Sequence, residues 1–326
     1  MWPVISVSLI SFVVATLAVG WLSRARIARL AIDQPNERSL HTVPVPRTGG
    51  IGVLLGIAAG WTLIAPALPL GFWCAAGLMI AISLLDDLRG LSAAVRLAAH
   101  LLAAALAAIS MFGAESPLLL AIAILAIGWM CNLYNFMDGS DGLAGGMAVS
   151  GFLAYAAAAW LAGSTQFALL SFAIAAAAAG FLPHNFHPAR IFLGDAGSIP
   201  LGFLAAILGL NGWLQRDWTW WFPLLVFSPF IVDASVTLGR RLLAGARVWE
   251  AHRDHYYQRL VKLGFGHRNT ALAEYALMAV CACAGLWAMT LDRSAQHVVL
   301  ALASLFYLAM IIVIEHAWRK KQAGHA

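Results

Sequence analysis

Long apolar runs recur along the whole chain and limit what it can fold into. A run of roughly 17 or more apolar residues can cross the hydrocarbon core of a bilayer as a helix. Only 11% of the 326 residues are charged, against about 25% in a soluble domain. The sequence therefore predicts an all-α polytopic membrane protein with a single domain over residues 1–326. Its candidate spans are 2–22, 51–68, 70–86, 94–112, 117–135, 143–162, 166–183, 198–213, 218–238, 270–290 and 296–317.

The basic residues predict how these eleven spans are oriented. The first run has no Lys or Arg before it and Arg24, Arg26 and Arg29 after it, which is the reverse of a cleaved signal peptide. We therefore expect a retained first span with a periplasmic N-terminus. With that start, 18 of the 20 Lys and Arg residues fall in inside segments and only Arg216 and Arg293 fall outside. The positive-inside rule then predicts a cytoplasmic C-terminus.

Acidic residues gather at the same membrane surface as the basic ones. Ionisable groups in membrane segments are costly and usually functional, so this gathering predicts an active-site cleft on the cytoplasmic face. The loops concerned lie near 23–50, 86–96, 132–142, 184–197 and 239–269. The clustered acids are Asp33, Asp86, Asp87, Asp138, Asp141, Asp195, Asp233, Glu250 and Asp254.

The stretch NLYNFMDGSDGLAGG, which begins at Asn132, is unusual for the end of a membrane helix. If it is helical, Asn132, Asn135 and Asp138 share one face, and the glycines that follow let the backbone approach a ligand closely. An EF-hand is excluded because position 12 of a loop that starts at Asp138 is Val149 rather than Glu. A P-loop is excluded because no Lys follows the glycines. A simple polar turn would explain the glycines but not the four polar side chains, of which Asp141 is the last.

Two further motifs carry carboxylates, LLDDLRGLSAAVRL and FLGDAGS. Adjacent acids such as Asp86 and Asp87 repel each other, so the pKa of one rises unless a cation or metal intervenes. Capping of the next span by Asp87 or Ser92 would explain one acid but not the pair. Asp195, taken alone, would be a helix cap more often than a metal ligand. Beside Asn135 and the acid pair, it indicates a site for a cation bound through oxygen atoms.

Two basic loops complete the set, DQPNERSLHTVPVPRTGG and AHRDHYYQRLVKLGFGHRN. Attraction to anionic lipid would explain the first loop on its own. Positive-inside anchoring would explain the Arg and Lys of the second loop, but not two His at i, i+3. The basic side chains of interest are Arg38, His41, Arg47, His252, Arg253 and His255.

Together these loops supply oxygen ligands for a hard cation and positive charge for phosphates. Mg²⁺ binds through one or two carboxylates plus substrate phosphate oxygens, and phosphoryl transfer depends on such neutralisation. A site at the membrane surface can take one substrate from water and one from lipid. The residues alone therefore predict a membrane phosphotransferase.

With these motifs in this order, residues 31–269 resemble the polyprenyl-phosphate N-acetylhexosamine-1-phosphate transferases, the superfamily that includes phospho-N-acetylmuramoyl-pentapeptide transferase. The resemblance rests on DQPNERSLHTVPVPRTGG, LLDD, NLYNFMDGSDGL, FLGDAGS and the HRDH loop. It implies a multi-pass bundle of ten or eleven helices in the bacterial inner (plasma) membrane. It also implies transfer of a sugar 1-phosphate from a UDP-sugar to undecaprenyl phosphate, with release of UMP. Nucleic acid is not an expected partner, and a homodimer is compatible with the sequence.

The resemblance further implies the roles of particular residues. The catalytic acid pair matches Asp86 and Asp87, and the ligands of Mg²⁺, for which Mn²⁺ could substitute, match Asn135 and Asp195. Phe192 matches the aromatic residue that stacks on uracil, with Asn185 nearby. The substrate-binding set that follows is Asn132, Asp138, Asp141, Asn185, Phe192, His252, Arg253, His255 and Arg47.

Departures from the family pattern narrow the expected subgroup. The third acid of the family's DDxxD pattern is Gly90 here, the triple-His loop of the muramoyl-pentapeptide branch is replaced by HRDHYY, and HTVPVPRTGG carries no lysine. A peptidoglycan precursor role is therefore not expected. HRDHYYQRL looks more like the subgroup that initiates O-antigen or other cell-surface polysaccharides, with an N-acetylated hexosamine or 6-deoxyhexosamine as the sugar.

Other classes of membrane protein fit the sequence less well. A transporter would place its ionisable groups near the membrane midplane, whereas these lie at one surface. A CDP-alcohol phosphatidyltransferase would need a motif that begins DGxxAR, which DGSDGL does not match. A lipid-binding scaffold without chemistry would not need the carboxylates and Asn135 together. The cysteines Cys74, Cys131, Cys281 and Cys283 are expected to be reduced and structural.

Overall fold

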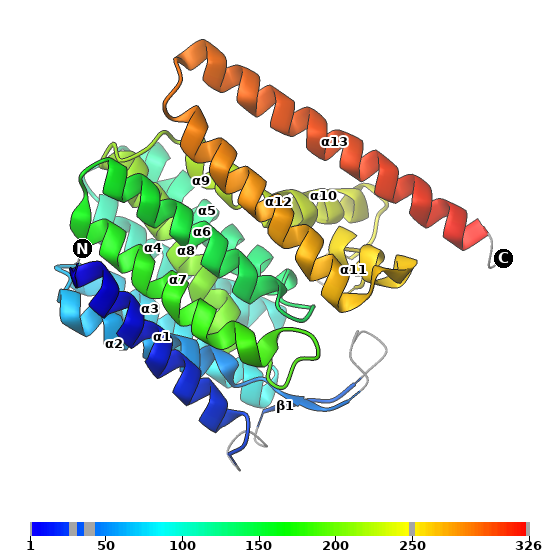
Figure 1. Cartoon of the computed structure of the whole chain (residues 1–326), viewed down its shortest axis with the longest axis horizontal. Helices are drawn as coiled ribbons and strands as arrows, with labels where there is room; N and C mark the ends of the chain where they lie inside the picture. The colour runs from blue at the N-terminus through cyan, green and yellow to red at the C-terminus, as the bar shows by residue number, and fades with distance from the viewer. Residues whose placement is uncertain (1, 26–30, 36–42, 248–251, 324–326) are drawn as a thin grey trace.

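The computed structural model describes residues 2–25, 31–35, 43–247 and 252–323, so Arg38, His41 and Glu250 lie outside the described residues. The chain forms a helical bundle (Figure 1). Its α-helices are α1 (Trp2–Leu22), α2 (Gly49–Ile64), α3 (Leu70–Arg89), α4 (Ala93–Phe112), α5 (Pro117–Phe136), α6 (Leu143–Leu161), α7 (Thr165–Asn185), α8 (Asp195–Leu214), α9 (Trp221–Val226), α10 (Ser228–Leu243), α11 (Tyr256–Leu260), α12 (Gly266–Ala288) and α13 (Arg293–Ala323). A π-helical turn, η2 (Val261–Phe265), joins α11 to α12, and β1 (Ile32–Asp33) pairs antiparallel with β2 (Val45–Pro46).

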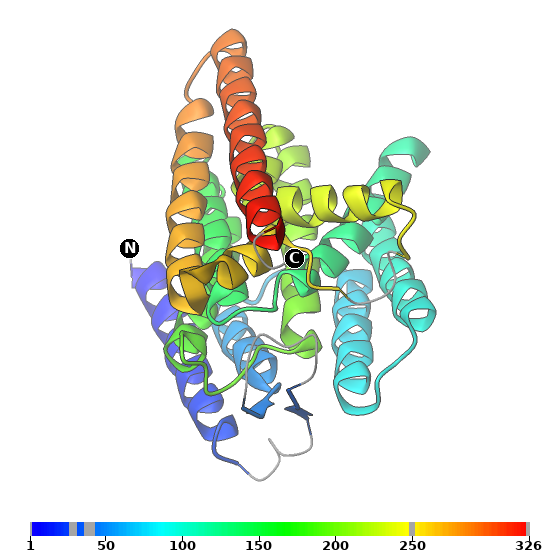
Figure 2. The ribbon, with the colours of Figure 1, turned by 90° about the vertical axis from the view of Figure 1, so that its right-hand side faces the viewer.

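Within the described part of the chain, nine helical stretches are long and apolar enough to cross a membrane, and α2 is a shorter apolar helix. The chain is thus a multi-pass membrane protein. The expectation of one span over 218–238 is wrong, because the helix breaks at Phe227. Pro229 in the first turn of α10 explains the break, since it has no N–H to give and its ring clashes with the preceding turn of a continuous helix. Figure 2 shows α10, in yellow, running across the direction of the other long helices.

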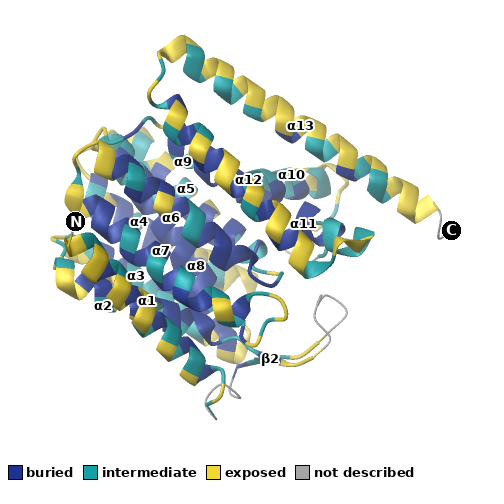
Figure 3. Ribbon diagram, in the orientation of Figure 1, coloured by how far each residue is buried: buried dark blue, intermediate teal, exposed yellow. Residues whose placement is uncertain are grey.

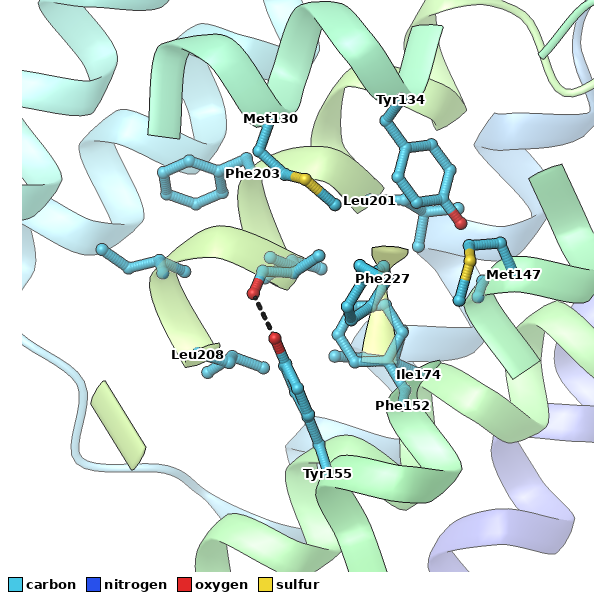
Figure 4. Packing of buried hydrophobic residues seen from close by; sticks show 14 of the residues in the cluster. Met130, Tyr134, Met147, Phe152, Tyr155, Ile174, Leu201, Phe203, Leu208 and Phe227 are labelled. Carbon is cyan, nitrogen blue, oxygen red and sulfur yellow. Dashed lines mark hydrogen bonds between the residues drawn. The ribbon is translucent and has the colours of Figure 1, made fainter. Parts of the chain in front are cut away.

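The buried residues form one core that runs through the bundle and is densest in α6, α7 and α8 (Figure 3). Figure 4 shows this core, in which Tyr155 is fully buried and donates its hydroxyl hydrogen bond to the carbonyl of Ala205. In contrast, α13 has only Tyr307 and Ile314 buried and lies on the outside of the bundle. The centre of the bundle is therefore a packed platform, and α13 is an addition to its side.

Helices alternate in direction, so their connections fall at two opposite ends of the bundle. We call the end that carries Gly90, Asp138 and Gly194 the loop end, and the end that carries Gly113 and Gly163 the far end. The two short strands and the C-terminus also lie at the loop end (Figure 1). Every residue expected to take part in chemistry and described in the structure belongs to helix termini or connections there.

The start of α2 packs against the connection before α8 without any side chain between them. The backbone N–H of Gly49 donates to the carbonyl of Phe192 at 2.9 Å, and that of Gly50 donates to the carbonyl of Leu193 at 2.7 Å. A Cβ on Gly50 would lie 2.3 Å from the Cα of Gly197. The two glycines of PRTGG therefore allow a close backbone approach that positions the connection bearing Phe192.

Candidate active site

Asp86 lies near the end of α3 and is held by two donors. Its Oδ2 accepts from the guanidinium of Arg96 at 2.8 Å, and its Oδ1 accepts from the backbone N–H of Leu91. The same Arg96 nitrogen is 3.7 Å from Oδ2 of Asp195. A cation in the first turns of a helix is unfavourable because of the helix dipole. Arg96 lies near the start of α4, and these two carboxylates compensate for its unfavourable position. Arg96 was not assigned a role from the sequence, although this unfavourable helix position was a signal.

Asp87, the neighbour of Asp86, faces a different element. Its carboxylate accepts from the backbone N–H of Asp195 at 3.2 Å and from that of Ala196 at 2.9 Å. These are among the first N–H groups of α8, which have no partner inside the helix. The guanidinium of Arg47 donates to the backbone carbonyl of Asp87 at 3.0 Å. Asp87 therefore fixes the start of α8, and with it the carboxylate of Asp195.

The carboxyl group of Asp195 lies near the side chains of Asp86 and Asn135, and Arg96 lies between the two carboxyl groups. Asp138 lies near this group too, because its carboxyl group is close to the backbone N–H of Gly194. Burial raises the pKa of Asp138 well above its ordinary value, and the charges of Asp195 and Asp87 raise it further. Three predicted motifs thus meet in one cluster of acids.

Asp138 does not extend the helical face of Asn132 and Asn135, as a continuous helix would require. The helix α5 ends at Phe136, and Asp138 lies in the turn that follows. The amide of Asn132 donates to the carbonyl of Gly128 at 2.7 Å, one turn back in the same helix. The side chain of Asn132 thus pairs with a backbone carbonyl of its own helix, while the turn brings Asp138 toward Gly194.

The cluster can supply part of a coordination shell for a divalent cation. Among the described residues, no three His, Cys, Asp or Glu side chains have the spacing of a complete metal site. Mg²⁺ is usually bound by one or two carboxylates together with phosphate oxygens and water, rather than by an all-protein cage. The carboxylates of Asp86 and Asp195 and the amide oxygen of Asn135 fit that incomplete type of site.

Asp141 belongs to the same turn but contacts a different set of groups. Its Oδ2 accepts from Nδ1 of His187 at 2.6 Å and from the backbone N–H of Ala189 at 3.2 Å. The ring of His187 stacks on that of His267, with centroids 5.4 Å apart, and Nδ1 of His267 is 2.9 Å from the hydroxyl of Ser140. Two histidines absent from the sequence-based site therefore lie beside it, because α12 folds back over the turn.

Asn185 links two loops, and the residue is only 3% exposed. Its Oδ1 accepts from the backbone N–H of Gly142 at 2.9 Å, and its Nδ2 donates to the carbonyl of Ile191 at 3.0 Å. Phe192 follows directly and is half-buried. Asn185 thus acts here as a link between the turn after α5 and the loop before α8, next to Phe192.

The segment 252–257 packs against the end of α5. The ring of His255 stacks on those of Phe136 and His252, at centroid distances of 6.2 Å and 4.9 Å. Burial, together with the neighbouring His255 and Arg241, lowers the pKa of His252 to about 4. Both histidines expected to bind substrate therefore lie beside the helix end that carries Asn135, and Arg253 lies between them in the sequence.

Comparison with known proteins gives one family and a set of similar enzymes. Residues 69–212 match glycosyl transferase family 4. The chain is 31% identical to a probable undecaprenyl-phosphate N-acetylglucosaminyl 1-phosphate transferase from Bacillus subtilis, over 82% of this chain and 81% of that one.

Two further similar proteins cover more of the chain. A decaprenyl-phosphate N-acetylglucosaminephosphotransferase from Mycolicibacterium smegmatis is 28% identical over 94% of this chain and 87% of its own. An undecaprenyl-phosphate alpha-N-acetylglucosaminyl 1-phosphate transferase from Escherichia coli O157:H7 is 26% identical over 97% of this chain and 92% of its own. The similarity thus extends over nearly the whole chain.

Proposed function

Since this chain belongs to glycosyl transferase family 4, among the enzymes that transfer a sugar phosphate to polyprenyl phosphate, we propose that it moves a sugar 1-phosphate from a UDP-sugar to undecaprenyl phosphate and releases UMP. The sugar is an N-acetylated hexosamine or 6-deoxyhexosamine, and the product starts an O-antigen or other cell-surface polysaccharide. The loop end faces the cytoplasm of a cell with a bacterial inner membrane, where the UDP-sugar is available.

One observation carries this proposal. Asp86, Asn135 and Asp195 come from three different helices and meet at the loop end, with Asp138 beside them. A polar cluster of this composition at a helix bundle's surface fits a diphosphate that arrives with a divalent cation. The segment 252–257, which carries His252, Arg253 and His255, lies against the end of α5.

An apolar cavity supports a lipid acceptor. It has a volume of about 480 Å³ and lies between α5, α8, α9 and α10. It extends from Leu133, one turn before the end of α5, to Trp213 and Trp220 near the far end. An apolar cavity whose lining ends at Leu133, two residues before Asn135 in the sequence, suits a polyprenyl chain, because the chain remains in an apolar environment while its phosphate lies toward the loop end.

The residues divide the work of the reaction as follows. When bound, Mg²⁺ would neutralise and orient the diphosphate, held by Asn135 and Asp195. Asp87 fixes the start of α8 and so the position of Asp195. Asp86 orients the attacking phosphate or accepts a proton. Because the second pKa of a phosphate monoester is about 6, the lipid phosphate is largely dianionic at neutral pH and needs little activation.

We further propose direct attack by the lipid phosphate. The oxygen of the lipid phosphate forms a bond to the phosphorus that bears the sugar, and the bond from that phosphorus to UMP breaks. Positioning and charge neutralisation then account for most of the catalysis. The alternative is a double displacement in which an aspartate first takes the sugar phosphate.

Transfer itself is tested by incubating membranes that contain the protein with undecaprenyl phosphate and a panel of UDP-sugars. We expect UMP release with at least one UDP-N-acetylhexosamine, and no release when the lipid is omitted. Membranes that contain Asp195→Asn serve as the control. No UMP release with any sugar of the panel would contradict the proposed donor class.

Isotope exchange separates the two reaction courses. A covalent route lets labelled UMP exchange into UDP-sugar in detergent without any polyprenyl phosphate. Direct attack gives no exchange until the lipid acceptor or its product is added. Robust exchange in lipid-free enzyme would show a sugar-phosphate intermediate on the protein and overturn direct attack.

A further inference from the structure

Asp233 in α10 carries a buried carboxylate whose hydrogen-bond partners lie outside the acid cluster. The residue is 6% exposed. Its Oδ1 accepts from Thr237 Oγ1 at 3.2 Å, from His255 Nδ1 at 3.1 Å and from the backbone N–H of Tyr256 at 2.9 Å. Its Oδ2 accepts from the backbone N–H of Tyr257 at 2.9 Å. Four donors match the roughly four acceptor positions of an ionised carboxylate, and three of them belong to residues 255–257.

Two of these donors are the first N–H groups of α11. Such groups have no partner within the helix, and the side chain of His255, which precedes the helix, makes no cap hydrogen bond to it. Tyr256 and Tyr257 are 3% and 0% exposed, so water cannot replace the missing partner. Asp233 therefore supplies the N-terminal cap of α11 from another helix, where a negative charge is also favoured by the helix dipole.

The third donor fixes the histidine of the segment. An ionised carboxylate can only accept a hydrogen bond, so Nδ1 of His255 carries the hydrogen and Nε2 is the nitrogen left for another partner. Carboxylate–histidine pairs of this kind set both the tautomer and the orientation of an imidazole.

The segment held in this way reaches the acid cluster through Tyr257. The hydroxyl of Tyr257 donates to the backbone carbonyl of Phe136 at 3.1 Å. Phe136 is the last residue of α5 and directly follows Asn135, and its ring stacks on His255. Movement of residues 255–257 would therefore disturb the end of α5.

We propose that Asp233 is a positioning residue for the transfer reaction: it holds residues 252–257 against the end of α5, so that this segment meets the phosphates of the sugar nucleotide in one arrangement. Asp233 does not touch substrate and acts only through His255 and the start of α11. The kinetic effect of this role rests on the proposed function. The contacts by which Asp233 holds residues 255–257 do not depend on that function.

The test compares Asp233→Asn with wild type in kinetics and in amide hydrogen exchange. Asn keeps the size of Asp but has an NH₂ group in place of one carboxylate oxygen. This NH₂ group would face donors and could not accept their hydrogen bonds. We expect the KM for the UDP-sugar to rise about 10- to 100-fold, as when other outer-shell partners are lost, with the KM for polyprenyl phosphate unchanged. A loss of folded protein alone would lower the rate but would not alter one KM and spare the other. Amides of residues 255–257 should exchange faster, while those of α5 to α8 stay protected.

Two companion variants make the test decisive. Thr237→Val removes one hydrogen bond to Asp233 without touching residues 255–257, so its donor KM should stay within about threefold of wild type. Tyr257→Phe keeps the cap but removes the bond to Phe136, so it should raise the donor KM without faster exchange at residues 255–257. If Asp233→Asn does not fold, an unaltered donor KM in Tyr257→Phe overturns the proposal.

Other outcomes are also informative. Wild-type donor KM in folded Asp233→Asn overturns the positioning role, whatever its exchange pattern. Unchanged exchange at residues 255–257 overturns the cap. If wild type releases no UMP from any UDP-sugar, the proposed function fails instead, and the exchange measurement alone decides whether Asp233 holds the segment.

Discussion

Neighbouring acids in this protein have separate tasks, which is clearest at Asp86 and Asp87. The carboxylate of Asp87 caps α8, whereas that of Asp86 lies with Arg96 and Asp195. Because successive side chains on a helix point about 100° apart, two adjacent acids at one helix end can serve two different elements. Asp87 therefore has a structural contact with α8, whereas Asp86 faces the proposed reaction site. The two acids are not equivalent bases.

Asp195→Asn should abolish turnover while leaving the protein folded. Asn has nearly the size of Asp but lacks the charge that attracts Mg²⁺, and we expect the rate to fall by a factor of about 100 or more. UMP release by purified enzyme measures the rate, and the apparent Tm reports folding. Asn135→Ala should behave in the same way. Asp217→Asn at the far end is the matched control, and full activity of Asp195→Asn at ordinary Mg²⁺ concentrations would remove Asp195 from the metal site.

Asp138 should make the metal-free protein less stable as the pH rises. Its pKa is raised in the folded state, so the folded protein binds this proton more tightly than the unfolded chain does. The resulting stability is fully present below the unfolded pKa of about 3.9 and is lost as the pH rises toward the folded pKa. In chelator at pH 8, Asp138→Asn should therefore have an apparent Tm about 2 °C or more above wild type.

The same difference should disappear in two conditions. Near pH 3, below the unfolded pKa of about 3.9, the wild-type carboxyl group is protonated in the folded state and largely protonated in the unfolded chain, so the two proteins should melt nearly together. Added Mg²⁺ should raise the wild-type Tm at pH 8, because it neutralises the cluster around Asp195. Parallel melting curves of wild type and Asp138→Asn from pH 3 to pH 8 would show that Asp138 has no raised pKa.

Sequence motifs named residues that lie near one another in the structure but not the partners of these residues. Asp86, Asn135 and Asp195 were expected together and lie close together. The contacts of Arg96, His187 and Asp233 were not predicted, because they are made with residues 10, 46 and 22 positions away. Such contacts are set by helix packing, which the local pattern of a motif does not contain. The expected contacts of Phe192 with a base and of Arg253 with phosphate stay predictions.

At the scale of whole elements, apolar length predicted most helices but not where they break. The structure follows the predicted spans closely from α3 to α8, since each is bounded by turn residues or caps such as Ser92 and Ser116. The run 218–238 is as apolar as the others, yet the helix breaks at Phe227. Hydropathy cannot register this break, because it counts Pro223 and Pro229 only as members of the run.

At the contact between α2 and the start of α8, a single added methyl group should lower both stability and activity. Gly50→Ala would place a Cβ 2.3 Å from backbone atoms of Gly197, and backbone cannot turn aside as a flexible side chain can. We expect a loss of activity and a Tm lower by several degrees, consistent with an overpacking cost of about 1–3 kcal/mol. Thermal unfolding in detergent and UMP release would measure both effects.

Gly77→Ala in the middle of α3 is the matched control for that variant. A Cβ on Gly77 meets no atom within 4 Å, and replacing Gly by Ala inside a helix is favourable by about 0.5–1 kcal/mol. Its Tm should therefore equal or exceed that of wild type, with full activity. If Gly50→Ala behaves like Gly77→Ala, the close backbone approach of α2 to the loop before α8 is not required.

For the whole molecule, the fold separates a rigid platform from the parts that complete the site. The helices α1 to α8 form the packed centre and carry the acid cluster, whereas α10 to α12 bring Asp233, His255 and His267 to it from one side. The far end of the bundle has no comparable gathering of acids among the described residues. Membrane spanning and the gathering of acids at one end of the bundle were thus predictable from the sequence, but the crossing of α10 over the bundle was not.

The orientation of this whole bundle in the membrane is the last expectation to test. Eighteen of the 20 Lys and Arg residues fall in the segments predicted to lie inside, and the described ones among these segments connect helices or end the chain at the loop end, which the positive-inside rule assigns to the cytoplasm. In a variant whose native cysteines are replaced, a single cysteine at Arg268 or at Gln322 should react with an impermeant maleimide only after the membrane is opened. A cysteine at Glu115, at the far end, should react in intact cells. Labelling of the first two positions from outside would place the acid cluster in the periplasm, where a cytosolic UDP-sugar could not reach it, and would contradict the proposed reaction together with the topology.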